Sequence, residues 1–266
     1  MLIDTHAHLT SARFSGQVGE IIQRADEAGV KKIITIACDL PDSEKVIKLA
    51  AAHDCVFPTV GIHPCYVHEI EPSDWLDILR ELAGTNPVAA IGEIGLDYFH
   101  EPPEGYSVPE WREKQAEVFE KQLILATELD LPVVIHTRKS GDDVISILKR
   151  HPEVRAVLHC FSGSMEQAEE ALKLGHYLSF TGVVTYPKAP KVQAVATNVP
   201  EDRFMVETDS PYLTPVPFRG KSNESAYVSY IASKIAQLRG ITDQECARIT
   251  TQNAHRFFQN IGNGTS

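Results

Sequence analysis

The chain has 266 residues, of which 43% are hydrophobic, and its formal net charge is −11. This composition is typical of a folded globular protein, and the length suits one large α/β domain that spans residues 1–266. The negative charge excludes a broad basic surface for nucleic acid, because like charges repel at long range.

Eight short β-rich segments alternate with amphipathic segments along the chain. We expect strands at about 2–6, 31–37, 56–62, 89–94, 132–136, 156–160, 177–181 and 204–209. We expect helices near 15–29, 42–53, 73–83, 110–130, 141–150, 164–174 and 189–198, and two more near 224–239 and 242–260. Strands that alternate with helices form parallel sheets, and eight such units favour closure into a TIM-like (β/α)8 barrel.

Two of the expected strand-to-helix connections are long. Residues 97–109 follow the fourth strand and residues 210–223 follow the eighth, and both are rich in proline and contain glycine. Connections longer than the usual few residues tend to have a functional role. We therefore expect both loops to wall the mouth of an active site.

The first strand leads into the sequence Asp4-Thr5-His6-Ala7-His8. Side chains along a strand alternate between its two faces, so His6 and His8 point the same way. Two imidazoles with this spacing offer a metal ion two nitrogen ligands. The N-terminal segment therefore predicts one half of a metal site.

Further ligand-type side chains stand near the C-terminal ends of other predicted strands, namely His63, Glu93, His136, His159 and Asp209. In β/α barrels these strand ends meet at one face, which carries the active site. We expect one divalent ion on His6, His8, Glu93 and Asp209. We expect a second divalent ion on Glu93, His136 and His159, so that Glu93 bridges the pair.

This ligand set is typical of a hydrolytic centre with two ions. Neutral imidazoles add no charge, and the carboxylates partly neutralise the ions. Two ions about 3.5–4 Å apart stabilise the attacking and the leaving oxygen of a hydrolysis, and a water between them ionises near neutral pH. Asp209 is the expected general base for that water. Zinc, manganese, iron or nickel suit these ligands, and magnesium is less expected among so many imidazoles.

At these residues the chain resembles the TatD-type metal-dependent deoxyribonucleases of the amidohydrolase superfamily. The motifs that carry the resemblance span the chain and follow the family's order: Asp4-Thr5-His6-Ala7-His8-Leu9, Gly61-Ile62-His63-Pro64, Gly92-Glu93-Ile94-Gly95-Leu96-Asp97-Tyr98, Leu131-Pro132 with His136-Thr137-Arg138, His159-Cys160-Phe161-Ser162-Gly163, Glu207-Thr208-Asp209-Ser210-Pro211-Tyr212-Leu213 and Arg219-Gly220-Lys221-Ser222-Asn223-Glu224. Two positions depart from the pattern: Cys65 stands where a second histidine is common, and Ser225 where proline is usual.

The resemblance implies a TIM-like barrel, a divalent-metal site and hydrolysis of DNA phosphodiester bonds, often from the 3′ end. It implies that His63 contacts a substrate phosphate. It also implies that Glu207 supports catalysis, a further metal ion being one way to do so. Single-stranded ends are the expected substrate, because a pocket at a barrel mouth admits a strand end more readily than the side of a duplex.

Basic side chains on the expected rim offer further contacts to a substrate. Arg138 can clamp a phosphate with its two-pronged guanidinium group, or it can pair with Asp142 or Asp143. Arg219 and Lys221 lie in the loop after the eighth strand, where they contact phosphate or are solvated loop charges.

Three other residues near the rim, Asp97, Cys160 and Cys65, are not assigned a catalytic role. Asp97 is expected to brace the loop after the fourth strand rather than bind metal. Cys160 is expected to face away from His159 as a buried thiol. Cys65 lies near the rim, where a thiolate can bind zinc adventitiously.

Two rival functions remain open from the residues alone. The same centre can cleave an amide, ester or lactone bond of a small molecule, but the basic rim residues suit phosphate better. A barrel with structural metals, or with none, can instead bind a partner protein. Structural sites are closed, whereas the second ion has three protein ligands and an open position.

The remaining features concern the cell compartment and the cofactors. The five cysteines show no C-x-x-C spacing, which indicates a reducing compartment. No apolar run is long enough to span a membrane, and no secretory signal is visible. The patterns of nucleotide-binding loops are absent from the sequence. We expect a cytoplasmic monomer without a nucleotide cofactor.

Overall fold

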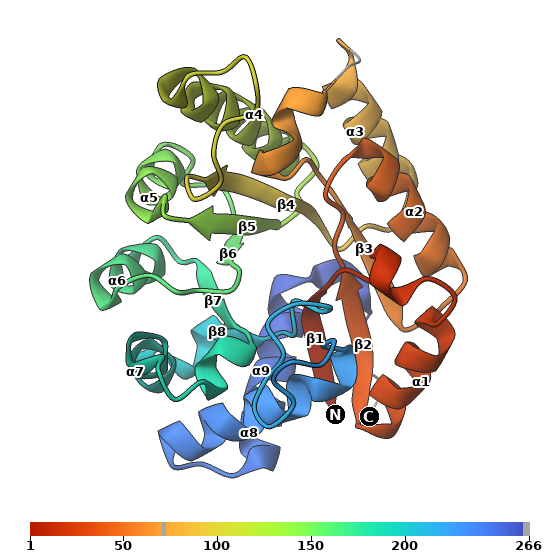
Figure 1. The fold of residues 1–266 in the computed structure, drawn as a ribbon, viewed down its shortest axis with the longest axis vertical. Coiled ribbons are helices and arrows are strands. Elements are labelled where there is room, and N and C mark those ends of the chain that lie inside the picture. Colours follow the sequence, from red (N-terminus) through yellow and green to blue (C-terminus); the bar gives the residue numbers. More distant parts are fainter. Residues whose placement is uncertain (71–72, 263–266) are drawn as a thin grey trace.

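A ring of parallel strands forms the centre of the computed structural model, which describes residues 1–70 and 73–262 (Figure 1). The eight strands are neighbours in the order of the sequence. They are β1 (Leu2–Ala7), β2 (Val30–Thr35), β3 (Val56–Val60), β4 (Ala90–Asp97), β5 (Val133–Arg138), β6 (Ala156–Leu158), β7 (Tyr177–Phe180) and β8 (Phe204–Val206). The predicted TIM-like (β/α)8 barrel is confirmed.

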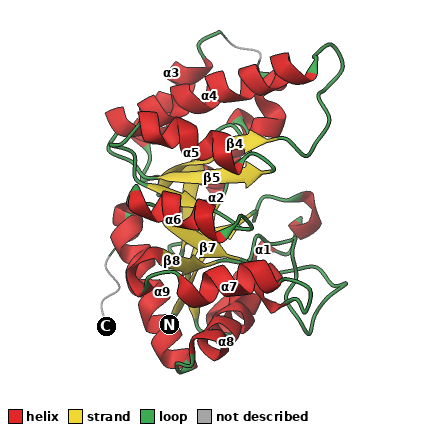
Figure 2. Cartoon of the chain, turned by 90° about the vertical axis from the view of Figure 1, so that its left-hand side faces the viewer, coloured by secondary structure: helices red, strands yellow, loops and turns green. Residues whose placement is uncertain are grey.

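Helices follow the strands in turn and surround them (Figure 1). They are α1 (Val18–Glu27), α2 (Leu40–Ala51), α3 (Trp75–Thr85), α4 (Val108–Glu128), α5 (Gly141–Arg150), α6 (Met165–Lys173), α7 (Pro190–Asn198), α8 (Val228–Arg239) and α9 (Asp243–Phe257). In Figure 2, β4 and β5 point to the right, and long loops extend on that side. Among the described residues, no helix is both long and apolar enough to cross a membrane.

The end of the barrel where the strands begin is filled by α9 and the residues after it. Phe257 and Phe258 are buried in one apolar cluster with Met205 of β8. Asn253 donates from Nδ2 to the carbonyl oxygen of Phe204, at 2.8 Å, where β8 begins. This apolar base leaves the opposite end of the barrel for polar groups.

The barrel closes between β1 and the segment that follows β8. The Asp209 N–H donates to the carbonyl oxygen of His6, and the His8 N–H donates to that of Ser210, both at 2.8 Å. Buried Asp4 adds a side-chain link, because it accepts from the Thr208 N–H at 2.8 Å and from the Thr208 hydroxyl at 2.6 Å. Three candidate metal ligands, His6, His8 and Asp209, therefore take part in the hydrogen bonds that close the barrel.

Helix α4 fixes the ends of two strands by means of buried glutamines. Gln115 donates to the Asp97 carbonyl oxygen at 3.1 Å and accepts from its N–H at 2.8 Å. Gln122 makes the same pair of bonds with Ile62, at 3.1 and 2.8 Å. Each side-chain amide thus satisfies a backbone N–H and a backbone carbonyl oxygen, as a neighbouring strand would.

Several strands end earlier than the sequence predicts, and two of them were expected to carry candidate ligands at their ends. The sixth and eighth were expected to reach residues 160 and 209, but they end at Leu158 and Val206. Cys160 and Asp209 have φ angles of 46° and 56°, which are incompatible with a strand. The expectation that Cys160 faces away from His159 on a strand is therefore wrong. Cys160 lies in a turn, and its N–H donates to Glu207 Oε1 at 2.6 Å.

Candidate metal centre

Four side chains meet at the closure between β1 and β8. The Nε2 atoms of His6 and His8 lie 3.3 Å apart. Glu93 Oε2 lies 3.3 Å from the first of these nitrogens and 3.8 Å from the second. Asp209 Oδ1 lies 3.6 and 3.4 Å from the same two atoms. His6, His8 and Glu93 thus form a group whose ligand atoms all lie within 4.8 Å of one another, and Asp209 approaches both of its histidines.

The spacing of these four atoms fits a shared cation. Ligand atoms of a tetrahedral zinc ion with bonds of about 2.0–2.1 Å lie roughly 3.3 Å from one another. His6 and His8 turn the same kind of nitrogen toward each other and toward two carboxylates, so both rings, when deprotonated at Nε2, present lone pairs to a common space. A cation is the group that satisfies all four, so the residues fit the divalent ion that the sequence predicts.

A second cluster forms on the other oxygen of Glu93. Its Oε1 lies 2.7 Å from His136 Nδ1 and 2.9 Å from His159 Nε2. Glu93 is 2% exposed and lies between the two clusters. One carboxylate therefore offers one oxygen to each group of histidines, which is the arrangement of a bridging ligand.

Carboxylates stand behind both histidines of the second cluster, and one of them orients its ring. Asp97 Oδ2 is hydrogen-bonded to His136 Nε2 at 3.0 Å, which leaves His136 Nδ1 for Glu93. Glu207 Oε1 lies 3.3 Å from His159 Nδ1 without forming a hydrogen bond to it, while His159 Nε2 faces Glu93. Carboxylates in this position fix the tautomer of a metal-binding histidine and strengthen its basicity.

His63 differs from the other histidines in the way its ring is held. Its Nδ1 accepts a hydrogen bond from the Cys65 N–H at 3.1 Å. Burial, and to a smaller extent nearby His136, lower the pKa of His63 to about 3, so the ring is neutral at pH 7. A neutral ring that accepts at Nδ1 carries its proton on Nε2. This nitrogen lies 3.7 Å from Glu93 Oε1 and is set up to donate.

The carboxylates of the centre are ionised. Burial alone raises the pKa of Glu93, but the charges of His159 and His6 outweigh it and hold the pKa well below 4.5. Burial also acts against the charge on Asp209, and contact with His8 then lowers its pKa below the ordinary value. An anionic pair among imidazoles is the charge pattern that a divalent cation requires.

Uptake of a cation is expected to release protons. Burial works against charge on His8 and His159, but Asp209 beside His8, and Glu93 beside His159, hold both pKa values well above 6.5 in the ion-free protein. These imidazoles must lose a proton to bind metal, so affinity should rise with pH until both have deprotonated. Calorimetry of zinc binding at pH 7 in two buffers of different ionisation enthalpy checks this. Heats that are the same in both buffers would contradict it.

Glycines beside Glu93 allow β4 and β5 to approach closely. A Cβ on Gly92 would lie 2.7 Å from the Cβ of Val134. Gly95 has a φ of 140°, and a Cβ there would collide with the carbonyl oxygen of His136. The Gly-Glu-Ile-Gly sequence therefore brings Glu93 within reach of the histidine on the next strand.

The predicted phosphate contacts lie on exposed segments around the centre. Arg138 lies over the ring of Phe99, 4.0 Å from its centroid. The alternative pairing with an aspartate is not formed among the described residues, since Gln167 donates to Asp142 at 2.7 Å and Tyr98 to Asp143 at 2.9 Å.

The two basic residues after β8 also rest on aromatic rings. The guanidinium group of Arg219 lies 4.0 Å from the centroid of Tyr186, and Lys221 Nζ lies 5.8 Å from that of Phe218. Both side chains are exposed. In this conformation neither reaches the two clusters around Glu93.

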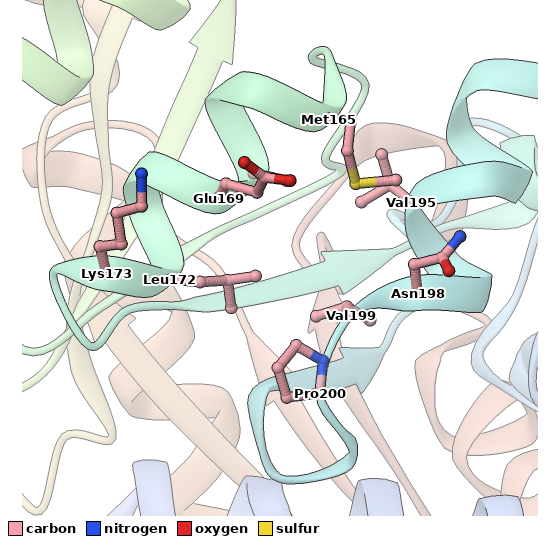
Figure 3. Close-up of a pocket in the computed structure, with 9 residues that line it drawn as sticks. Met165, Glu169, Leu172, Lys173, Val195, Asn198, Val199 and Pro200 are labelled. Atoms are coloured by element: carbon pink, nitrogen blue, oxygen red, sulfur yellow. The ribbon is translucent and has the colours of Figure 1, made fainter.

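A different hollow lies between α6 and α7 on the outside of the barrel (Figure 3). Its lining is mostly apolar, with Leu172, Val195 and Pro200 among its residues. It contains none of the histidines described above.

Sequence reasoning missed two neighbours of the centre. Asp97 was expected to brace its loop, which it does, but it also contacts His136. Its position four residues after Glu93 on the same strand face was a usable signal. Cys38 Sγ lies 3.7 Å from His8 Nδ1, and no motif pointed to this thiol.

Comparison with known proteins identifies the family. A family model described as TatD related DNase matches residues 3–259. An uncharacterized metal-dependent hydrolase, YabD, from Bacillus subtilis (strain 168) is 40% identical over 261 residues, which cover 97% of this chain and 99% of the relative. A protein named 3′-5′ ssDNA/RNA exonuclease TatD, from Erwinia tasmaniensis, is 35% identical over 265 residues, which cover 97% and 99% of the two chains.

A solved structure agrees with this assignment. The crystal structure of YJJV, a TatD homologue from Escherichia coli K12, has a TM-score of 0.90 at 33% identity, and the match covers 97% of this chain and 98% of that one. The similarity extends over the whole barrel rather than over one motif. The chain therefore belongs to the TatD related DNase family and is a metal-dependent hydrolase.

Proposed function

We propose that the protein is a two-ion phosphodiesterase that degrades DNA from single-stranded ends in the 3′–5′ direction. The observation that carries the proposal is the position of Glu93, which offers one oxygen to each of two ligand clusters. Paired divalent ions polarise a phosphoryl oxygen and make a bound water acidic enough to act as a nucleophile. The name of the Erwinia relative, a 3′-5′ ssDNA/RNA exonuclease, supports a nucleic-acid substrate.

Other side chains have separate roles in proton transfer and in substrate binding. Asp209 is ionised and its Oδ1 lies 3.4 Å from His8 Nε2, at the first cluster, so it is the general base that accepts the proton of the attacking water. Glu207 lies 3.3 Å behind His159 and supports the centre by its negative charge. Arg138, Arg219 and Lys221 attract the phosphates that follow the strand end.

Aromatic rings around the mouth support a single-stranded substrate. Tyr212 is 48% exposed, and its ring lies 6.0 Å from that of His8. Phe99 is 47% exposed and carries Arg138 on one face. Unpaired bases stack on such rings with little dependence on sequence. An acidic protein that lacks a broad basic surface can hold a strand end in this way.

Substitution of His63 by alanine is expected to weaken phosphate binding without removal of an ion. A hydrogen bond to a charged group contributes about 1.5–3 kcal/mol, so kcat/KM for a small phosphodiester should fall roughly 10- to 100-fold. Steady-state kinetics with bis(p-nitrophenyl) phosphate, together with the metal content of the purified variant, tests this. If the variant retained one ion where the wild type holds two, His63 would be a ligand rather than a donor.

The proposed function is tested by turnover on labelled nucleic acid. The protein is depleted of metal, reconstituted separately with zinc, manganese or nickel, and incubated with single-stranded DNA labelled at the 5′ or the 3′ end. We expect the 3′ label to leave first as a mononucleotide, while the 5′-labelled strand shortens in steps. Circular single-stranded DNA of the same length is the matched control and should remain intact. Cleavage of the circle at the same rate would exclude an exonuclease.

Hydrolysis of a small molecule is the second candidate function. It is favoured by the positions of Arg138 and Arg219, which rest on aromatic rings and not against the ligand clusters. A panel of amides, esters and lactones, tested under the same metal conditions, separates the two. Faster turnover of any of these than of DNA would assign the centre to small-molecule chemistry.

A further inference from the structure

A third group of ligand-type side chains stands beside the centre, at the mouth of the barrel. It consists of Cys65, Asp97 and His100. Cys65 belongs to a short helical turn after β3 (Pro64–Glu69), and Asp97 is the last residue of β4. His100 follows in the loop to α4. The three come from two different connections, so only the folded barrel brings them together.

We propose that Cys65, Asp97 and His100 bind a zinc ion distinct from those of the Glu93 centre. Cys65 Sγ lies 3.6 Å from His100 Nδ1, and His100 Nδ1 lies 3.0 Å from Asp97 Oδ2. One atom from each residue lies within 4.8 Å of the others. Around a tetrahedral zinc ion with Zn–S of about 2.3 Å and Zn–N of about 2.0–2.1 Å, sulfur and nitrogen lie roughly 3.5 Å apart.

The two carboxylate oxygens of Asp97 contact different groups. Its Oδ1 accepts the backbone N–H groups of Phe99 and His100, at 2.8 and 3.0 Å, and this alone shapes the turn after β4. Its Oδ2 takes no part in the turn and faces the rings of His100 and His136. The oxygen offered to the third group thus accepts no backbone N–H of the turn, and it is shared with His136 Nε2, which lies 3.0 Å away.

Charge and access agree with a zinc site. A thiolate and a carboxylate together neutralise a divalent cation, and a thiolate selects zinc over magnesium and calcium. The Asp97 side chain is fully buried, whereas the His100 side chain is 54% exposed. A cation can therefore reach the group from solvent on the side of His100 and bind the buried Asp97 carboxylate on the other. Three protein ligands leave a fourth position for water or for a substrate group.

Cobalt is the probe for this site, because a cobalt–thiolate bond gives a charge-transfer absorption in the near ultraviolet that nitrogen and oxygen ligands do not give. The full-length protein, depleted of metal, is titrated with cobalt and then with zinc. We expect the band to appear in the wild type and to disappear as zinc displaces cobalt. Its absence from the wild type at saturating cobalt would overturn the proposal.

Three substitutions identify the thiolate. Cys65→Ser should abolish the band and reduce the zinc content by one ion, measured by mass spectrometry after dialysis at fixed free zinc. Cys38→Ser is the matched control, since this thiol lies near His8, and it should leave the band unchanged. His100→Ala should weaken the third zinc by at least about 10-fold. A band that persists in Cys65→Ser, or is lost in Cys38→Ser, would assign the thiolate ligand elsewhere and refute the site.

Discussion

Replacement of Glu93 by glutamine is expected to remove both ions and to lower turnover by roughly 10³-fold, because Lewis-acid stabilisation contributes several kcal/mol. The amide keeps the shape of the side chain but loses the charge that both clusters share. Glu93 stands at the mouth, away from the apolar base formed around Phe257 and Met205. The barrel should therefore remain folded. Metal content, circular dichroism and steady-state rates measure the three effects.

Glu101→Gln is the matched control for this experiment, since Glu101 is an exposed residue of the loop after β4. Surface substitutions of this kind change stability by no more than about 0.5 kcal/mol. The control should retain metal and activity. Near-normal turnover in Glu93→Gln, or the loss of only one ion, would show that the carboxylate does not bridge.

Replacement of Asp209 by asparagine is expected to lower kcat by about 10²- to 10⁴-fold, the usual contribution of a general base. Asp209 has a φ of 56°, and asparagine tolerates this backbone conformation well. The N–H that donates to the carbonyl oxygen of His6 is retained, so the closure of the barrel stays intact. The amide, however, accepts no proton from water and is a weaker ligand.

Two measurements separate these roles of Asp209. Metal content reports the loss of a ligand, and kcat at saturating metal reports the loss of the base. Asp202→Asn, at an exposed position before β8, controls for the substitution itself. A kcat within a factor of ten of the wild type at saturating metal would assign the proton transfer to another group.

The fold could be predicted from the sequence because each β/α unit has its own local pattern. The longest helix is predicted near 110–130, and α4 does span Val108–Glu128. The side chains proposed as ligands could be selected because barrel topology places strand ends together, wherever they stand in the sequence. His6 and Asp209 are about two hundred residues apart in the chain and 3.6 Å apart in space.

The remaining features of the site depend on the course of the backbone in turns and loops, which no local sequence pattern specifies. His159 and Asp209 were expected on strands, but the positive φ of Cys160 and Asp209 turns the chain just after β6 and β8. The contact between Cys65 and His100 depends on how two loops approach each other. The hydrogen bonds that the side-chain amides of Gln115 and Gln122 make to the backbone could not be predicted from the sequence either. A glutamine in an amphipathic helix is ordinarily a surface residue.

The hydrogen bonds between His6 and Asp209, and between His8 and Ser210, join the two ends of the barrel's chain and can form only when both ends have been synthesised. A nascent chain on the ribosome exposes the edge of β1 until more than two hundred residues have been synthesised. During that time the histidines of β1 have no acidic partner from the far end of the polypeptide. A chain that ends before residue 209 therefore lacks both hydrogen bonds of the closure and one of the four side chains predicted for the first ion.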